Sequence, residues 1–167
     1  ILDFDNLTEE NIYVLDSPIL TNSQFKKFKK FFSKKTKEIE CTFDISSSLK
    51  DRIEEIREEA ETSVREGSTC LILSDKNISN KKASIPSILT VGAVHSHLVK
   101  LGLRGYCSLN VECADALDTH SFAILIGVGA TTINPYLAID SIYQRYEKKL
   151  FGKSDFETCV SKFKKSI

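Results

Sequence analysis

The sequence has no methionine and no tryptophan, and it holds only three prolines and three histidines among its 167 residues. Because it has neither an initiator methionine nor the charged and apolar blocks of a signal peptide, we expect a segment of a longer polypeptide or a trimmed chain. No apolar run approaches the roughly 20 residues that a membrane-spanning helix needs. The net charge is zero, whereas proteins that bind nucleic acid or anionic membranes carry a basic excess. We therefore expect neither kind of partner.

The five cysteines are odd in number and widely spaced. An odd count without a close Cys-x-x-Cys pair argues against a disulfide framework and against a zinc site. Cys41, Cys70 and Cys107 lie in apolar, strand-like runs, where a free thiol behaves as a small hydrophobic side chain. Free thiols persist in a reducing compartment, so the sequence predicts a cytoplasmic location.

Hydrophobic residues make up 41% of the chain and charged residues 28%, a balance typical of a domain with a sizeable core. The length suits a single domain spanning residues 1–167. Apolar runs with strand character alternate with segments of helical periodicity. Strands are expected at residues 12–15, 38–43, 69–73, 107–111 and 132–136, and helices at residues 21–32, 48–66, 86–101, 119–128, 138–150 and 155–165.

This alternation predicts an α/β fold of about five βα units in a mostly parallel sheet with right-handed crossovers. The run TCLIL at residues 69–73 is apolar on both faces, as expected for a parallel strand that is covered by helices. Eight units are needed to close a βα barrel. Five units predict an open sheet or an incomplete, barrel-like arc.

The most apolar and most distinctive stretch spans residues 120–140. It predicts a short buried helix, a turn around Gly127 and Gly129, a short strand and the start of another helix. A phosphate-binding dinucleotide loop would need a third glycine at position 132, which is a threonine, and should follow a strand. The two glycines are therefore expected to form a hinge between helix and strand. Pro135 cannot donate a hydrogen bond to a neighbouring strand, so the strand expected at residues 132–136 should be short.

Acidic residues and a histidine gather after the fourth expected strand. Glu112, Asp115, Asp118 and His120 would lie at the C-terminal end of that strand, where α/β proteins place their sites. An acid and a histidine there could perform general acid–base catalysis. In the alternative, Asp118 or Thr119 caps the next helix and the acids lie near its positive end. We favour this structural interpretation, so the sequence predicts no catalytic, cofactor-binding or metal-binding residue.

Two further patterns have both a functional and a structural interpretation. His95 and His97 resemble a metal-binding pair, but residues i and i+2 of a helix lie about 200° apart and cannot meet one ion. Seven lysines between Lys26 and Lys37 could bind an anion, yet lysines on a helix surface are more typical of a solvated face. The structural interpretation is favoured for both patterns.

Several stretches together resemble the central domain of the large subunit of glutamate synthase. They occur in the family's order with family-like spacing, and the resemblance spans about residues 12–145. The stretches are LDSPIL (15–20), LILSD (71–75), IPSIL (85–89), VGAVHSHLV (91–99), and HSFAILIGVGA (120–130) running on to NPYLA (134–138).

The resemblance implies a part in an enzyme that makes glutamate from glutamine and 2-oxoglutarate. In this family a glutaminase domain releases ammonia, and a domain with FMN and an iron–sulfur cluster uses it to form glutamate. The central domain lies between them and has an α/β fold related to an incomplete barrel. Neither the glutaminase nucleophile nor the flavin or cluster ligands fall in this segment, so the resemblance implies no cofactor here. It leaves the electron donor, ferredoxin or a nicotinamide nucleotide, open.

The resemblance also implies that the partners are other domains of the same polypeptide, the glutaminase and FMN-binding synthase domains, and that this domain fixes their geometry. Candidate docking surfaces are residues 112–118 and 129–135. The residues singled out as interdomain or structural candidates are Glu112, Asp115, His120, Gly127, Gly129, Asn134 and Pro135. One alternative is a free-standing small α/β enzyme that uses Glu112, Asp115 and His120. Another is an interaction module that binds an anion through the lysine-rich helix.

Overall fold

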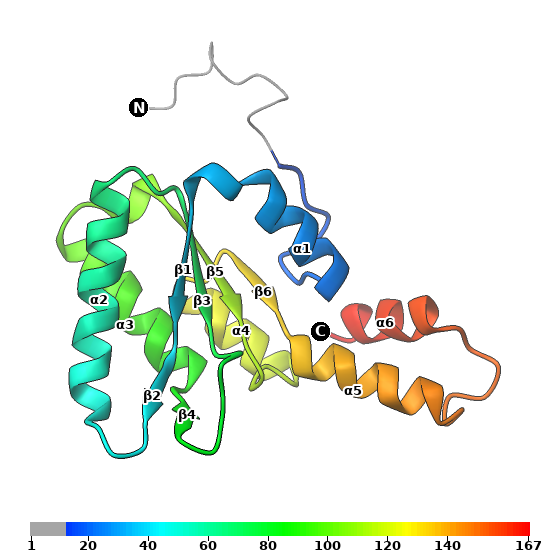
Figure 1. The fold of residues 1–167 in the computed structure, drawn as a ribbon. Helices are drawn as coiled ribbons and strands as arrows, with labels where there is room; N and C mark the ends of the chain where they lie inside the picture. Colours follow the sequence, from blue (N-terminus) through cyan, green and yellow to red (C-terminus); the bar gives the residue numbers. More distant parts are fainter. Residues whose placement is uncertain (1–12) are drawn as a thin grey trace, which may run out of the picture.

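The structure, a computed structural model, describes residues 13–167 and shows an α/β fold with two sheets (Figure 1). The larger sheet has the strand order β1-β3-β5-β6, and the smaller sheet pairs β2 with β4. The elements are α1 (Asn22–Phe31), β1 (Thr36–Glu40), β2 (Thr42–Asp44), α2 (Leu49–Arg65), β3 (Cys70–Ser74), β4 (Lys82–Ser84), α3 (Ser87–Lys100), β5 (Ser108–Glu112), α4 (Thr119–Gly127), β6 (Thr132–Asn134), α5 (Tyr136–Glu147) and α6 (Phe156–Lys165), with short 3₁₀ helices at Ser33–Lys35 and Arg104–Tyr106.

The four strands of the larger sheet are parallel and lie in the order in which they occur along the chain. Successive βα units therefore advance in one direction, and the connecting helices α2, α3 and α4 pack on the same face of the sheet. This is the arrangement of a βα barrel that stops before closure. The predicted α/β fold, with a parallel sheet in an open arc, is confirmed.

Alternate side chains of each strand point to opposite faces of the sheet. Leu71 and Leu73 of β3, together with Ile133 of β6, belong to the main core under α2, α3 and α4. Cys70 and Ile72 face the other way and belong to a second cluster under α1. All five residues of β3 are buried, because helices cover both of its faces, as the sequence predicts.

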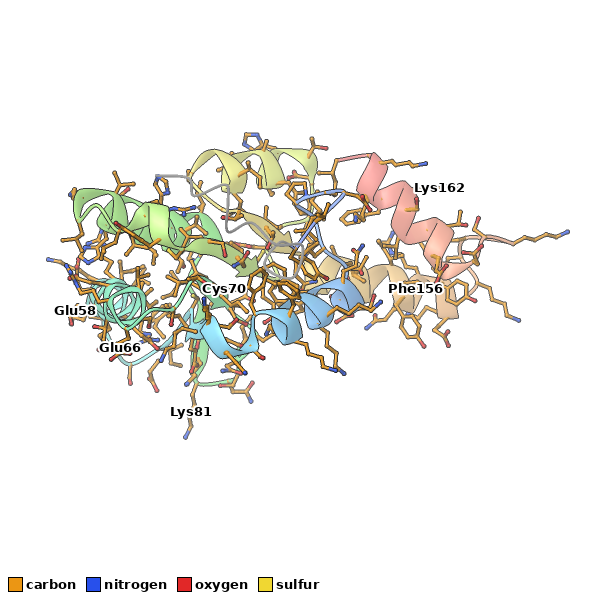
Figure 2. The ribbon with its side chains drawn as sticks, turned by 90° about the horizontal axis from the view of Figure 1, so that it is seen from above. Glu58, Glu66, Cys70, Lys81, Phe156 and Lys162 are labelled. Carbon is orange, nitrogen blue, oxygen red and sulfur yellow. The ribbon has the colours of Figure 1, made fainter. Side chains whose placement is uncertain are left out.

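Helix α1 covers the face of the sheet opposite α4, as the view from above shows (Figure 2). Phe25 and Phe28 are buried against the sheet, and Phe32 packs beside them. Thr21 begins the helix by accepting a hydrogen bond from the Gln24 amide at 3.2 Å, and the Gln24 side chain accepts one from the Thr21 amide at 3.0 Å. This reciprocal pair is a capping box, and the helix expected at residues 21–32 is confirmed.

The first expected strand, residues 12–15, is wrong where the structure describes it. Residues 13–15 are irregular, and residue 12 lies outside the described residues. Val14 is 83% exposed, and Tyr13 and Leu15 pack against the cluster under α1 without forming a strand. The pairing occurs later, where Ile19 forms a single parallel bridge with Ile133. Pro18 supplies only its carbonyl, which accepts from the Ile133 amide at 2.8 Å and needs no donor in return.

The expected strand at residues 38–43 divides between the two sheets, and β4 lies where the sequence indicates only a polar loop. Cys41 separates β1 from β2, and its amide donates to the Ser74 carbonyl at 2.7 Å. Beyond it the chain turns away and pairs antiparallel with β4. Residues 82–84 lack the apolar run that marks the strands of the larger sheet, because this two-stranded sheet lies outside the main core.

Helix α4 is less buried than its apolar sequence predicts. Of its nine residues, only Phe122 and Leu125 are buried, and Ile126 is 40% exposed. Helices α5 and α6 lie side by side and extend away from the sheet (Figure 1). The far end of α6 returns to the body, where the rings of Phe163 and Phe122 lie 6.2 Å apart. None of the helices in residues 13–167 is long and apolar enough to cross a membrane.

Candidate functional site

Glu112 is the last residue of β5, and its carboxylate joins three elements at the C-terminal edge of the sheet. It accepts from the Ser74 hydroxyl at 2.8 Å and forms ion pairs with Lys76 at 2.7 Å and with Lys29 of α1 at 3.2 Å. The residue is 2% exposed. Burial raises the pKa of the Glu112 carboxyl, but the bonds and charges of these partners outweigh burial and lower it. Glu112 is therefore a carboxylate held by the fold.

Asp75 follows β3 directly and is a buried acid with an incomplete set of partners. Its Oδ2 accepts from the Ala114 amide at 3.0 Å and from the Ser84 hydroxyl at 3.2 Å. Among the described residues, Oδ1 has no hydrogen bond of normal geometry, although the Tyr136 side chain lies beside the carboxylate. Burial raises the pKa of Asp75 and, together with the Asp75 charge, the pKa of Tyr136.

Asp75 is not among the site residues expected from sequence, although an acid that directly follows a wholly apolar strand is a detectable signal. A cavity of about 10 Å³ adjoins it, which is room for about one water molecule. Its walls include Asp75, Ser87, Thr90 and Cys113. Such a space is too small for a substrate.

Asp115 caps helix α3 from a distant part of the chain. Pro86, at the start of α3, has no side chain that can cap the helix. Asp115 takes that place, accepting from the Ser87 amide at 2.9 Å and from the Ser87 hydroxyl at 2.5 Å. A carboxylate at a helix N-terminus satisfies a free amide and interacts favourably with the helix dipole. The structure thus gives Asp115 a structural role.

His120 lies in the first turn of α4 and is exposed. Asp118 caps the same helix by accepting from the Ser121 amide at 2.8 Å, as the structural interpretation of the sequence proposed. A shallow pocket of about 130 Å³ is bordered by His120 and Asp115 but not by Glu112, whose carboxylate pairs with α1. The three groups of the free-standing enzyme hypothesis therefore do not converge on one site, and that alternative is not favoured.

The two glycines of the expected hinge differ in what they require. Gly129 has a φ of +117°, and a Cβ on it would lie 2.2 Å from Nδ1 of His95. Arg104 holds the two residues together, because it donates to His95 Nδ1 at 3.1 Å and to the Gly129 carbonyl at 2.8 Å. Gly127 ends α4, and no atom lies within 4 Å of the position a Cβ would take. The close contact that requires glycine is therefore at Gly129.

The two histidines of α3 contact different neighbours. His95 packs on Gly129, whereas Nε2 of His97 lies 2.9 Å from Glu61 of α2. This divergence is what the 200° separation of i and i+2 on a helix produces. Within residues 13–167, no group of three or more histidine, cysteine, aspartate or glutamate side chains is arranged to hold a metal ion.

Asn134 ends β6 and joins it to residues 20–22, and Pro135 follows it. Asn134 is 1% exposed, and its amide donates to the Leu20 carbonyl and to the Asn22 side chain, both at 2.9 Å. Pro135 stands at the start of α5. Both residues therefore connect structural elements, and whether they also contact other domains stays a prediction.

Comparisons with known proteins point to one family. The chain matches the family described as glutamate synthase central domain over residues 2–167. It is 43% identical over 170 aligned residues to the glutamate synthase (NADPH) large chain of Azospirillum brasilense, covering 100% of this chain and 11% of that protein. The corresponding protein of Bacillus subtilis is 37% identical over 155 residues, covering 92% of this chain and 10% of the relative.

The ferredoxin-dependent chloroplastic glutamate synthase of Spinacia oleracea is 38% identical over 137 residues, covering 78% of this chain and 8% of that protein. The chain thus spans about a tenth of the length of these relatives. The match along residues 2–167 includes each of the stretches on which the resemblance rested. This chain belongs to the glutamate synthase central domain family.

Proposed function

We propose that this chain is the connecting domain of a glutamate synthase large chain. In this role, residues 1–167 form one domain that holds a glutaminase domain and a synthase domain in register. Ammonia released from glutamine by the first is used by the second to convert 2-oxoglutarate to glutamate. Family membership supports the proposal, since the relatives are glutamate synthases about ten times as long as this chain.

The observation that carries the proposal is that Glu112 and Asp115, two of the three groups of the enzyme alternative, are engaged by groups of the fold itself. Glu112 is neutralised by lysines, and Asp115 is occupied by the start of α3. Groups engaged in this way stabilise the fold and leave little capacity for binding a substrate. A rigid spacer suits a reaction whose intermediate must stay out of water, because free ammonia would be protonated or lost.

The proposal assigns FMN and the iron–sulfur cluster to the neighbouring synthase domain, and no cofactor to this one. The partners are then the glutaminase and synthase domains of the same polypeptide. A reducing, cytoplasmic location is supported by the five cysteines, all of which are free and buried.

The test uses Gly129→Ala in the complete enzyme, with Gly105→Ala as the matched control. A Cβ at residue 129 meets His95, whereas residue 105 has open space around it and an ordinary φ. We expect Gly129→Ala to hydrolyse more glutamine than it converts to glutamate, and the control to keep the two rates equal. Both rates are measured in one assay with 2-oxoglutarate and reductant. Hydrogen exchange shows whether the substitution loosens the central domain. If exchange there is faster and the rates of glutamine hydrolysis and glutamate formation are still equal, the proposal is contradicted.

A further inference from the structure

The outer surface of α3 and α4 is unusually poor in charge for a surface. No lysine, arginine, aspartate or glutamate occurs in residues 87–99 or 119–128. Yet Ile88 of α3 is 44% exposed, Ile126 of α4 is 40% exposed, and Ala123 is exposed as well. A helix that is apolar on most sides is normally buried. The described chain covers only one side of α4.

Helix α2, on the same face of the sheet, shows what a solvated helix of this protein looks like. Its outer surface carries ion pairs such as Arg57–Glu54 at 2.6 Å and Arg65–Glu61 at 2.8 Å. Its apolar residues are confined to the buried side. Helices α2, α3 and α4 thus belong to one layer of the same molecule, but only α2 has a charged outer surface.

A groove of about 130 Å³ runs between α3 and α4 at this surface. Ile88 borders it from α3, and Ile124 and Leu125 border it from α4, with His120 and Asp115 among its polar neighbours. Ile88 and Ile124 border the groove, and Gly92, Ala123 and Gly127 of the same two helices are half-buried or exposed. We call these five residues the α3–α4 face.

Two members of the α3–α4 face are glycines that the described fold does not require. Gly92 lies inside α3, where glycine costs about 1 kcal/mol relative to alanine. No atom lies within 4 Å of the position a Cβ would take at Gly92 or at Gly127, and neither has a positive φ. Glycines at such positions allow the close approach of another backbone. Gly92 lies four residues after Ile88, so both are on the same stripe of α3.

We infer that an apolar helix from outside residues 1–167, in the same polypeptide, packs on the α3–α4 face. The inference rests on the proposed function, because it requires the chain to be part of a longer protein. In the relatives about nine tenths of the polypeptide lies outside the matching region, which supplies ample chain to cover the face. Apart from the Asp115 carboxylate at the edge of the groove, which is bonded to Ser87, the face is uncharged and selects an apolar segment. The two glycines admit a helix at short interaxial distance.

The test is thiol accessibility in the complete large chain. Ala123→Cys places a thiol at the centre of the α3–α4 face, and Glu58→Cys places one on the exposed, charged side of α2 (Figure 2). We expect a maleimide to label the Ala123→Cys thiol roughly 100-fold more slowly than the Glu58→Cys thiol, because the covering helix must open first. Labelling is located by peptide mass spectrometry, and both rates are normalised to the denatured chains. The native cysteines of this segment are buried. Equal rates would overturn the inference.

The identity of the covering segment is tested by attaching a short photo-crosslinker to the same thiol, in mixtures of isotope-labelled and unlabelled enzyme. A crosslink to a peptide of the same chain, outside this segment, is the expected result. A crosslink between labelled and unlabelled chains would show that a second copy covers the face and would overturn the inference. If Ala123→Cys does not accumulate, Gly127→Cys replaces it, because residue 127 is exposed and has open space around a Cβ. Labelling as fast as at Glu58→Cys then overturns the inference.

Coupling of glutamine hydrolysis to glutamate formation is measured in the same preparations. Fast labelling with intact coupling would reject the covering helix and leave the proposed function standing. Slow labelling in an enzyme that does not make glutamate from glutamine would support the covering helix and reject the proposed function.

Discussion

Gly129 and His95 are so closely packed that no side chain fits between them. The ring of His95 occupies the position of a Cβ on residue 129, with Nδ1 at 2.2 Å. Arg104 fixes both partners, and its third hydrogen bond, to the Cys107 carbonyl at 2.6 Å, ties them to the start of β5. The contact joins α3, the turn after α4 and the approach to β5, so it sets the position of three βα units at once.

We predict that Gly129→Ala lowers the free energy of unfolding by roughly 2–4 kcal/mol. The positive φ disfavours any side chain, and the ring of His95 must move to admit the methyl group. Gly105→Ala, with open space and an ordinary φ, should change stability by less than about 0.5 kcal/mol. Urea unfolding of both variants measures the difference. Equal midpoints would show that His95 moves aside without cost.

Glu112→Gln tests the ion-pair cluster at the sheet edge. The amide keeps the shape of the carboxylate but removes its charge, so the pairs with Lys76 and Lys29 are lost. We expect a loss of roughly 1.5–3 kcal/mol at pH 7, the range for hydrogen bonds to charged groups. Lys76 is half exposed and regains solvent, which limits the loss. The matched control is Glu54→Gln, whose ion pair on α2 is exposed and should contribute less.

The contribution of Glu112 should also depend on pH in a defined direction. Its pKa in the folded protein is lowered from 4.5, so folding favours the carboxylate. The stabilisation is then fully present above about pH 4.5 and is lost as the pH falls through the lower, folded-state pKa. The stability difference between the wild type and Glu112→Gln should therefore shrink in acid. A difference that grows in acid would contradict the ion-pair interpretation.

Asp115→Ala should destabilise the protein by about 0.5–2 kcal/mol, the usual cost of removing a helix cap. The carboxylate serves the start of α3 although it lies 28 positions away in sequence. Asp115→Asn keeps an oxygen acceptor for the Ser87 amide and should lose less. Circular dichroism during thermal unfolding gives the order of stability, which is wild type, then asparagine, then alanine. Equal loss in both variants would show that the charge, not the hydrogen bond, matters.

The fold was predictable from sequence wherever local signals and burial agree. TCLIL at residues 69–73, the cap at Asp118 and the helical periodicity of residues 21–32 and 48–66 all predicted elements that the structure shows. These features depend on near neighbours in the chain, which a reader of the sequence can see. The first strand failed because Ile19 pairs with Ile133 across 114 positions, a contact that no local pattern specifies.

The site was less predictable, because partners far apart in sequence define it. Glu112 and Asp115 belong to one short acidic run, yet one turns to α1 and the other to α3. The polar layer under α1 was also missed. It includes Asn110 and Thr132, whose side chains hydrogen bond at 2.8 Å. The alternation of polar and apolar residues in SLNVE (108–112) and TIN (132–134) was its sequence signal, since residues two apart share a face.

Folding shifts the pKa of Asp75 upwards and that of Glu112 downwards. Both carboxyls are buried, but Glu112 has two lysines beside it, whereas no cation offsets the burial of Asp75 among the largest influences on its pKa. The pKa of Asp75 is raised above 3.8 in the folded protein. Folding therefore favours its protonated form, and the charged form costs stability at neutral pH.

We predict that Asp75→Asn removes the loss of stability that this group causes as the pH rises above about 4. In the wild type, stability from this group falls as the pH rises from the unfolded pKa of 3.8 towards the raised, folded pKa, and is constant above it. Asparagine keeps an oxygen for the Ala114 amide and the Ser84 hydroxyl but cannot ionise. The stability of the variant relative to the wild type should therefore increase across that window. Urea unfolding at pH 4, 5.5 and 7 measures it. A relative loss that deepens with pH would show instead that the charged carboxylate stabilises this edge of the sheet.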